Sequence, residues 1–186
     1  MPRSIRYIMI KNIQQKNNCI IIETHRNQAY LFKPQKRTIN IEYEWMNLQF
    51  NSILFTLSKW DNSLISYMAN DNPFKRSTLW MPTPLPHVNE LGGVCLQNNN
   101  NISLEMQIDL FWNTNFDADE MIPPFIDIGE EDNNYEDFYR DLYEDWEDFD
   151  LEYQFKWYKH KDVPPELYAI LADIHNHFDP RISNDK

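Results

Sequence analysis

The sequence predicts an α+β fold: an antiparallel sheet with flanking helices, followed by an acidic C-terminal helical extension. Three observations carry this prediction. Short β-branched or alternating runs separated by turns fill the N-terminal part. Apolar residues recur at helical spacing near the C-terminus. Residues 130–150 hold eleven acids against one arginine. With 186 residues, we expect an α+β core over residues 1–125 and an extension over residues 126–186 that packs on this core.

The N-terminal part predicts an antiparallel sheet. Strands are expected over residues 4–10, 18–24, 29–32 and 38–44. Within the second strand, Cys19 is interpreted as a small core hydrophobe beside three isoleucines. In the fourth, Ile39, Ile41 and Tyr43 alternate with polar residues, which indicates one buried and one exposed face.

The middle of the chain is harder to assign. Residues 45–69 fit either a helix or a buried pair of strands, and residues 71–73, Asp-Asn-Pro, predict a turn. Residues 104–112 alternate with period two, but they also fit a short helix with Ser103 as N-cap. We favour the helix. Pro123-Pro124 closes this segment.

A C-terminal helix is predicted to start at residues 163–166, with proline in its first turn, and to stop at Asp179-Pro180. Its apolar stripe comprises Leu167, Ile170, Leu171 and Ile174. The two histidines His175 and His177 diverge by about 200° on a helix, so we expect no metal site there. Three glycines in the whole chain cannot build a phosphate-binding loop, and we expect no cofactor.

The charge of the chain is unevenly distributed. The net charge is −12, yet residues 1–60 hold nine basic and three acidic residues. This polarity favours a protein partner, self-association or an intramolecular clasp, and it argues against nucleic-acid binding. The acidic segment, residues 130–150, has apolar side chains at helical spacing. These candidate partner-binding residues are Tyr135, Phe138, Leu142, Trp146 and Phe149; packing on the domain's own core is the alternative.

Cysteine use and hydropathy indicate the compartment. Cys19 and Cys95 are too few and too far apart for a disulfide framework, so we expect reduced thiols and an intracellular, cytoplasmic protein. Neither a signal peptide nor a membrane span is predicted. Abundant Asn, Ile, Tyr and Phe suit an AT-rich source such as a phage or mobile element, where a structural component would lie in the virion.

The stretch before Cys95 concentrates residues that restrict or free the backbone. Prolines at positions 82, 84 and 86 predict a stiff, extended approach. Gly92 and Gly93 then predict a tight turn. A cysteine is thereby presented at the exit of a turn.

This stretch resembles the active-site signature of ubiquitin-conjugating (E2) enzymes. Residues 85–96 are Leu-Pro-His-Val-Asn-Glu-Leu-Gly-Gly-Val-Cys-Leu. The family signature is His-Pro-Asn, a hydrophobic residue, a short loop, Gly, any residue, Val or Ile, Cys and Leu, at the same spacing. Residues 72–75 are similar to the family's Tyr-Pro-Phe-Lys segment, and residues 111–116 resemble divergent bacterial and mobile-element E2-like proteins. The resemblance covers roughly residues 30–117.

The resemblance implies a UBC-like fold in which Cys95 carries a ubiquitin-like modifier as a thioester. A free thiol has a pKa near 8.5 and needs assistance. His87 replaces the family's asparagine, and Leu85 replaces its first histidine. An imidazole at position 87 could donate a hydrogen bond to an oxyanion or act as a base. Substitute donors are Asn89, Asn98 and Asn113.

These departures leave two functions open. One is an E2-like protein whose partners are a modifier and an activating enzyme. The other is a catalytically silent UBC-like scaffold, or an assembly protein of a phage or mobile element, that binds a protein partner through residues 130–150.

Overall fold

In the computed structural model the chain forms two sheets and two helices over the residues described, which are 10–25, 27–41, 43–89, 91–96, 101–116, 159 and 162–178. The strands are β1 (Ile10–Lys16), β2 (Cys19–Thr24), β3 (Gln28–Phe32), β4 (Gln35–Ile41), β5 (Glu44–Phe50), β6 (Ile53–Leu57), β7 (Leu64–Ala69), β8 (Trp80–Pro82) and β9 (Asn115–Phe116). The helices are α1 (Leu104–Asn113) and α3 (Pro165–Phe178).

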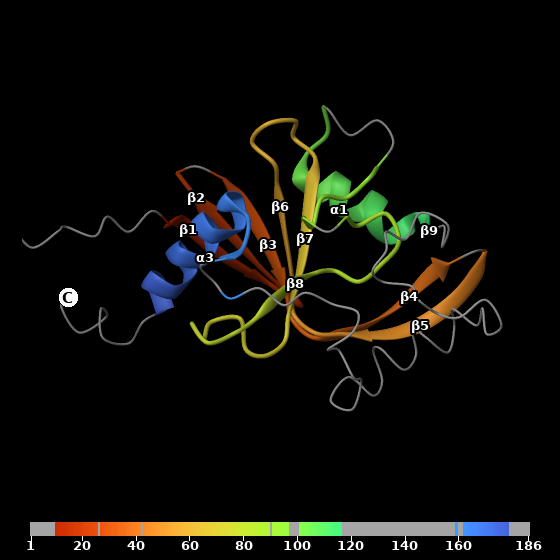
Figure 1. Ribbon diagram of the computed structural model, residues 1–186, viewed down its shortest axis with the longest axis horizontal. Helices are drawn as coiled ribbons and strands as arrows, with labels where there is room; N and C mark the ends of the chain where they lie inside the picture. The colour runs from red at the N-terminus through yellow and green to blue at the C-terminus, as the bar shows by residue number, and fades with distance from the viewer. Residues whose placement is uncertain are drawn as a thin grey trace, which may run out of the picture.

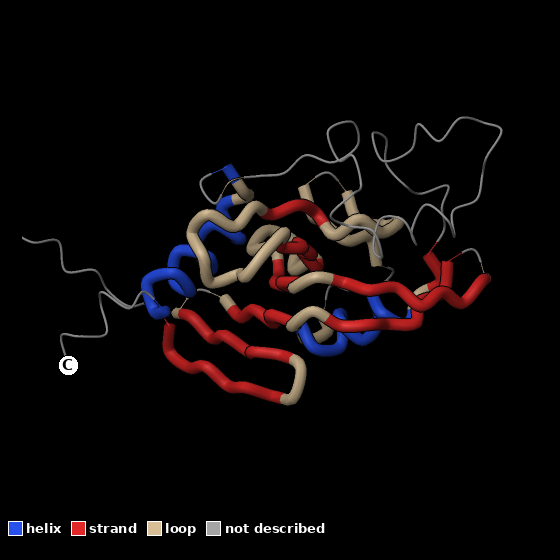
Figure 2. Tube along the Cα trace, turned by 90° about the horizontal axis from the view of Figure 1, so that it is seen from below, coloured by secondary structure: helices blue, strands red, loops and turns tan. Residues whose placement is uncertain are grey.

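The larger sheet has the strand order β1-β2-β3-β6-β7-β8, and all of its neighbouring strands are antiparallel. The smaller sheet has the order β5-β4-β9, in which the β4–β5 hairpin is antiparallel and β9 runs parallel to β4. Figures 1 and 2 show this hairpin extending away from the larger sheet. The β4–β5 hairpin is therefore inserted between β3 and β6 in the sequence, whereas β3 and β6 pair directly with each other in the larger sheet.

Both faces of the larger sheet are buried. Ile22, Leu31 and Leu54 point to the face that packs against α3. Ile53 and Phe55 point to the opposite face, which α1 and the β4–β5 hairpin cover. Figure 1 shows α3 lying across β1, β2 and β3. Because side chains alternate along a strand, the strands β2, β3, β6, β7 and β8 each supply both cores. A fully buried side chain of this size contributes about 1.5–3 kcal/mol.

Several predictions from the sequence are confirmed. The chain is α+β with a mainly antiparallel sheet. The segment 104–113 is a helix, and the Ser103 hydroxyl accepts a hydrogen bond from the backbone N–H of Met106 at 3.2 Å. The predicted stripe of α3 is buried, with exposed fractions of 0–1%. Residues 45–69, which the sequence left open, form strands rather than a helix.

The predicted strand over residues 38–44 is wrong at its C-terminal end. The strand β4 stops at Ile41, and β5 starts at Glu44. Tyr43 lies in the connecting turn with φ 66° and is 84% exposed, so it does not share the buried face of Ile39 and Ile41. Two-residue hairpin turns need a positive φ and usually carry Asn or Gly. The alternating pattern ran through this turn because Tyr43 is a strand-favouring residue.

The predicted first strand, residues 4–10, lies outside the described residues except for Ile10. The described strand β1 covers Ile10–Lys16, and the sequence predicted no strand over residues 11–16. Its side chains are mostly exposed, because β1 is the edge of the larger sheet, so it lacks the apolar run that marks a buried strand. The acidic segment 130–150 and the predicted helix stop at residues 179–180 likewise lie outside the described residues.

Candidate active site around Cys95

The proline-rich approach to Cys95 is extended only in part. The strand β8 ends at Pro82. The chain then folds back: the backbone N–H of Leu85 donates to the carbonyl of Thr83 at 2.8 Å, and that of Val88 donates to Leu85 at 3.3 Å. The predicted stiff, extended approach is thus wrong after Pro82. A proline fixes φ near −65°, which suits turns as well as extended chain.

A narrow hairpin presents the cysteine. Val88 and Val94 form an antiparallel bridge. The backbone N–H of Cys95 donates to the carbonyl of His87 at 2.8 Å. The two valines are buried, whereas Cys95 is exposed. The hairpin therefore anchors its apolar pair in the core and leaves the thiol accessible next to the backbone of His87.

Asn89 holds the turn of this hairpin together. Its Oδ1 accepts hydrogen bonds from the backbone N–H groups of Leu91 and Gly93, both at 2.9 Å. Its own backbone N–H donates to the carbonyl of Gly93, and its carbonyl accepts from the N–H of Gly92, again at 2.9 Å. Such an Asx-type arrangement replaces the backbone pairing that a turn cannot make for itself. The Oδ1 atom is thus committed to the loop.

Gly92 is required by both backbone and space. It adopts φ 78°, a left-handed conformation that favours glycine. A Cβ at this position would lie 2.1 Å from Cε2 of Tyr67, whose ring is fully buried. The ring of Tyr67 therefore packs against the turn at Gly92, and the predicted tight turn at the two glycines is confirmed.

The loop also completes the edge of the larger sheet. The N–H of Ser66 donates to the carbonyl of Gly92, and the N–H of Val94 donates to the carbonyl of Leu64, both at 2.8 Å. The strand β8 pairs with the second half of β7, from Tyr67 to Ala69. Residues 92–94 and β8 thus share one edge of β7, end to end. This pairing immobilises the backbone directly before Cys95.

The two cysteines have opposite surroundings. Cys19 is only 8% exposed, as predicted for a core strand residue, and burial raises the pKa of its thiol to about 11, with Glu105 adding to the rise. Cys95 is exposed. Of the two thiols, Cys95 is the one that a substrate in solution can reach.

His87 and Leu85 occupy the positions at which the resembled signature has its helper residues. His87 is half-buried, has φ 67°, and lies edge-on to the ring of Phe116 with centroids 6.0 Å apart. Leu85 is 2% exposed and belongs to the core on the α1 face. The structure thus brings His87, Asn89 and Cys95 together, while position 85 serves packing.

The remaining predicted donors lie elsewhere. Asn113 is at the end of α1, and its Nδ2 donates to the carbonyl of Asp109 at 2.7 Å, so that donor serves the helix. Asn98 and the five partner-binding residues of the segment 130–150 lie outside the described residues.

Sequence reasoning missed a cavity of about 410 Å³ beside the cysteine loop. Its walls include Tyr67, Gly93, Leu91 and Trp60, together with the start of α3. Trp60 is 91% exposed and Leu91 is 62% exposed. The signal in the sequence was Trp60, a tryptophan among the polar turn residues 58–63, where the pattern does not fit a core position. The cavity offers an apolar contact surface next to the turn that presents Cys95.

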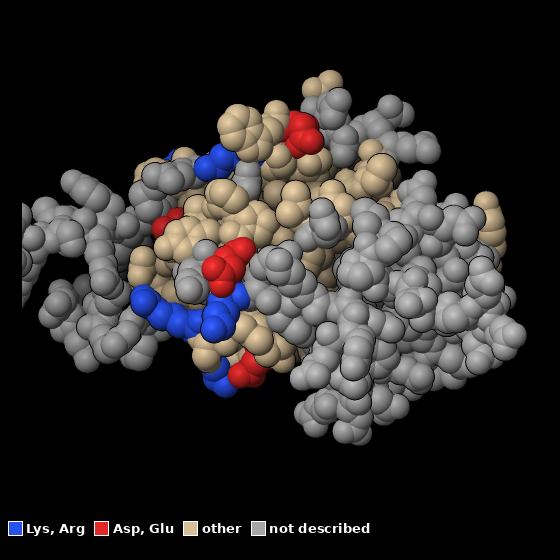
Figure 3. Space-filling view, in the orientation of Figure 1, with Lys and Arg blue, Asp and Glu red and all other residues tan. Residues whose placement is uncertain are grey.

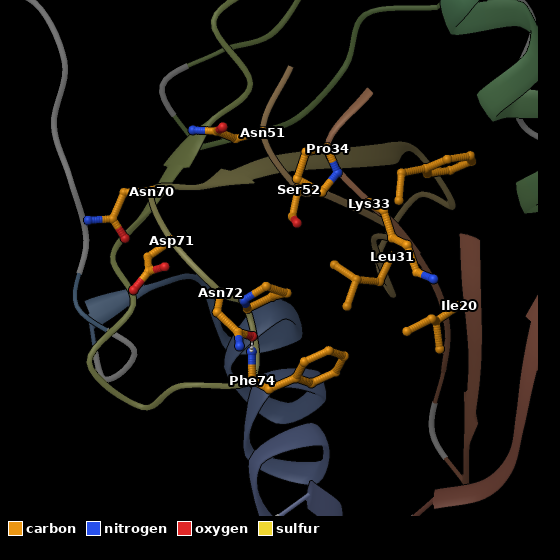
Figure 4. A pocket seen from close by; sticks show the side chains of 12 residues that line it. Ile20, Leu31, Lys33, Pro34, Asn51, Ser52, Asn70, Asp71, Asn72 and Phe74 are labelled. Carbon is orange, nitrogen blue, oxygen red and sulfur yellow. Dashed lines mark hydrogen bonds between the residues drawn. The ribbon is translucent and has the colours of Figure 1, made fainter. Parts of the chain in front are cut away.

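A second cavity, of about 400 Å³, lies between the larger sheet and the loop after β7. In Figure 4, Leu31 and Ile20 from the sheet face Phe74 across it, and asparagines stand at its rim. The rim serves the loop itself: Asn72 Oδ1 accepts from the N–H of Phe74 at 2.9 Å, and Asp71 pairs with Lys75 at 2.7 Å. We assign no chemistry to this cavity.

Three other features of the described residues concern surface charge, possible metal ligands and the length of apolar helices. In Figure 3, Lys and Arg lie mainly on the left of the face shown, with acidic side chains beside them, and uncharged side chains make up most of the rest of the described surface. Within the described ranges, His, Cys, Asp and Glu nowhere form a group of three that could bind a metal ion. His175 is buried, with Nε2 3.3 Å from the carbonyl oxygen of Pro73. None of the helices in the described part is long and apolar enough to span a membrane.

The chain matches no protein-family model, no curated protein and no solved structure.

Proposed function

We propose that this chain is an E2-like protein of UBC-like fold that carries a ubiquitin-like modifier as a thioester on Cys95. One observation carries the proposal. The exposed thiol stands at the exit of a turn whose backbone is fixed by Asn89, by β7 and by the ring of Tyr67. A nucleophile held in this way is accessible without being mobile, which favours reaction with a large acyl donor.

The proposed reaction consists of two acyl transfers and needs no cofactor. The Cys95 thiolate attacks the carbonyl carbon of a modifier thioester on an activating enzyme. A new C–S bond forms, the old one breaks, and the activating enzyme's thiolate leaves. In the second step an amine attacks the Cys95 thioester, a C–N bond forms, the Cys95 thiolate leaves, and the amine's proton passes to a base.

Two side chains are proposed to assist. The Nδ2 group of Asn89 is a donor that could stabilise the oxyanion, while its Oδ1 holds the loop. The imidazole of His87 is the other candidate, because its backbone carbonyl accepts the N–H of Cys95 at 2.8 Å. The cavity lined by Trp60 and Leu91 is proposed to contact the incoming protein.

The test is thioester formation on the full chain, with an activating enzyme and a ubiquitin-like modifier from the same source. We expect an adduct that a reducing agent removes, and a reductant-resistant oxyester with Cys95→Ser. The matched control is Cys19→Ala, which should load like the unmodified chain because Cys19 is buried. An adduct that persists in Cys95→Ala would refute the proposal, and so would the absence of any adduct.

The two roles of Asn89 can be separated. Asn89→Asp keeps an oxygen that accepts the N–H groups of Leu91 and Gly93, but it removes the Nδ2 donor. If Nδ2 stabilises an oxyanion, this variant should fold normally and transfer the modifier about 10²–10³-fold more slowly. Asn89→Ala should lose stability as well. Equal transfer rates for Asn89→Asp and the unmodified chain would remove Asn89 from the chemistry.

A second candidate is a silent scaffold, which the burial of Leu85 and the commitment of Asn89 Oδ1 to the loop favour. In that case a complex with a protein partner should survive Cys95→Ala and disappear when residues 130–150 are deleted. Light scattering or a pull-down with both variants measures this. A complex unaffected by the deletion contradicts the scaffold function.

A further inference from the structure

A smaller cavity, of about 200 Å³, lies on the α1 face of the larger sheet, away from the cysteine loop. The end of β1, the strands β2, β3 and β4, and the first turns of α1 contribute to its walls. Four charged residues line it, two basic and two acidic: Lys16, Arg37, Glu105 and Asp109. A cavity of this size is below the range of about 300–1,000 Å³ for drug-sized ligands, so it suits a small molecule.

The four charged groups are not paired with one another. Among the described residues, none of them takes part in an ion pair of 4.0 Å or less. The Nε of Arg37 is buried and has no hydrogen-bond partner. Buried polar groups in proteins are almost always hydrogen-bonded, so an exception calls for a partner. The Arg37 guanidinium and the exposed carboxylates of Glu105 and Asp109 thus line one small space without a direct ion pair. Burial lowers the pKa of Arg37, and the nearby charge of Asp109 opposes this shift.

The guanidinium of Arg37 is held in place from one side by aromatic rings. Its central carbon lies 4.5 Å from the ring centroid of Trp112 and 5.7 Å from that of Phe32. Such stacking orients the planar guanidinium, which then presents its donors in a fixed direction. A planar donor group held in this way suits bidentate recognition of a carboxylate.

The remaining wall is apolar. Ile21, Phe32 and Ile108 line the cavity beside the buried thiol of Cys19. The negative charge of Glu105 reaches this wall: burial first, and then Glu105, raises the pKa of Tyr30. The cavity therefore combines cationic, anionic and apolar walls in one small volume.

We propose that this cavity binds a small zwitterion, an α-amino acid with an aliphatic side chain. Its carboxylate pairs with Arg37 and Lys16, its ammonium group pairs with Glu105 and Asp109, and its side chain packs on the isoleucines. A simple anion would face the two carboxylates of Glu105 and Asp109, and a simple cation would face the positive charges of Lys16 and Arg37. Only a ligand with both charges pairs both sets of groups. The site is separate from Cys95 and does not depend on the conjugation chemistry.

The experiment titrates the full chain with L-leucine by isothermal calorimetry, and then with two analogues that each lack one charge. These are L-leucinamide, which lacks the carboxylate, and 4-methylpentanoate, which lacks the ammonium group. We expect L-leucine to bind and both analogues to bind at least tenfold more weakly. Absence of L-leucine binding overturns the proposal. Equal binding of all three ligands also overturns it, because the contact would then be apolar only.

Two variants locate the binding. Lys16→Gln and Glu105→Gln change exposed residues of the wall, so neither should disturb folding. Each should weaken L-leucine binding at least threefold, and the double variant at least tenfold. The matched controls Lys36→Gln and Glu23→Gln remove the same charges from exposed positions outside the cavity, and they should bind normally. Unchanged affinity in the double variant would place the ligand elsewhere and refute the site.

Discussion

Replacing Gly92 by alanine is the most direct test of how the cysteine loop is held. The left-handed backbone at φ 78° costs an L-residue about 1–2 kcal/mol. In addition, the new Cβ would lie 2.1 Å from a ring carbon of the fully buried Tyr67. Overpacking of this kind costs about 1–3 kcal/mol. We expect Gly92→Ala to lower the free energy of unfolding by about 2–5 kcal/mol, which corresponds to a decrease in Tm of roughly 4–20 °C for a chain of this size.

The assay is urea denaturation of both proteins, followed by the same measurement in a Tyr67→Leu background. Leucine removes Cε2 and Cζ of the ring and keeps a methyl group in place of Cδ2, so the cost should fall towards the backbone term of about 1–2 kcal/mol. A loss below about 0.5 kcal/mol for Gly92→Ala would refute the reasoning. An equal loss in the two backgrounds would show that the contact with Tyr67 is unimportant.

Three further predictions concern buried and exposed groups. A thiol reagent at neutral pH should label Cys95 rapidly, and Cys19 only in denaturant; mass spectrometry checks this, and two fast thiols contradict it. Folding raises the pKa of the Cys19 thiol to about 11. The contribution of this neutral thiol to the free energy of unfolding is therefore complete below pH 9 and should be lost as the pH rises through 11. The difference in stability between Cys19→Ala and the unmodified chain, measured from pH 8 to 11, should shrink accordingly; a constant difference is the contrary result. Gln107→Leu removes an Nε2 donor from the carbonyls of Asn62 (3.0 Å) and Ile102 (3.3 Å), and it should cost about 1–3 kcal/mol in urea denaturation; a neutral effect would mean that water replaces the amide.

The helices were predictable because their signals are local. Ser103 caps α1, and a proline in the first turn starts α3, and both features act within one turn of chain. The apolar stripe of each helix then indicates which of its faces is buried. In contrast, the hairpin tip at Tyr43 was missed, because its positive φ comes from pairing between β4 and β5 and from the hydrogen bond of its N–H with Asn115, which is 72 residues away. No local pattern contains that contact.

The candidate site shows the same division. The turn before Cys95 could be predicted, since two glycines beside a cysteine in a glycine-poor chain leave few interpretations. The reason why position 92 needs glycine could not be predicted, because Tyr67 lies 25 positions earlier and its ring meets the turn only after β7 has formed. The cavity lined by Lys16, Arg37, Glu105 and Asp109 could not be predicted for the same reason, because its charged residues come from β1, β4 and α1.

The position of Cys95 is determined by the sheet rather than by the helper residues of the resembled signature. Residues 92–94 occupy the edge of β7 that β8 leaves open, and their hydrogen bonds to Leu64 and Ser66 are as short as those of a regular ladder. An edge strand that is paired in this way cannot shift without exposing backbone groups of β7. We therefore expect substitution of the His87 side chain to leave the thiol in place, so that reactivity and position can be tested by separate variants.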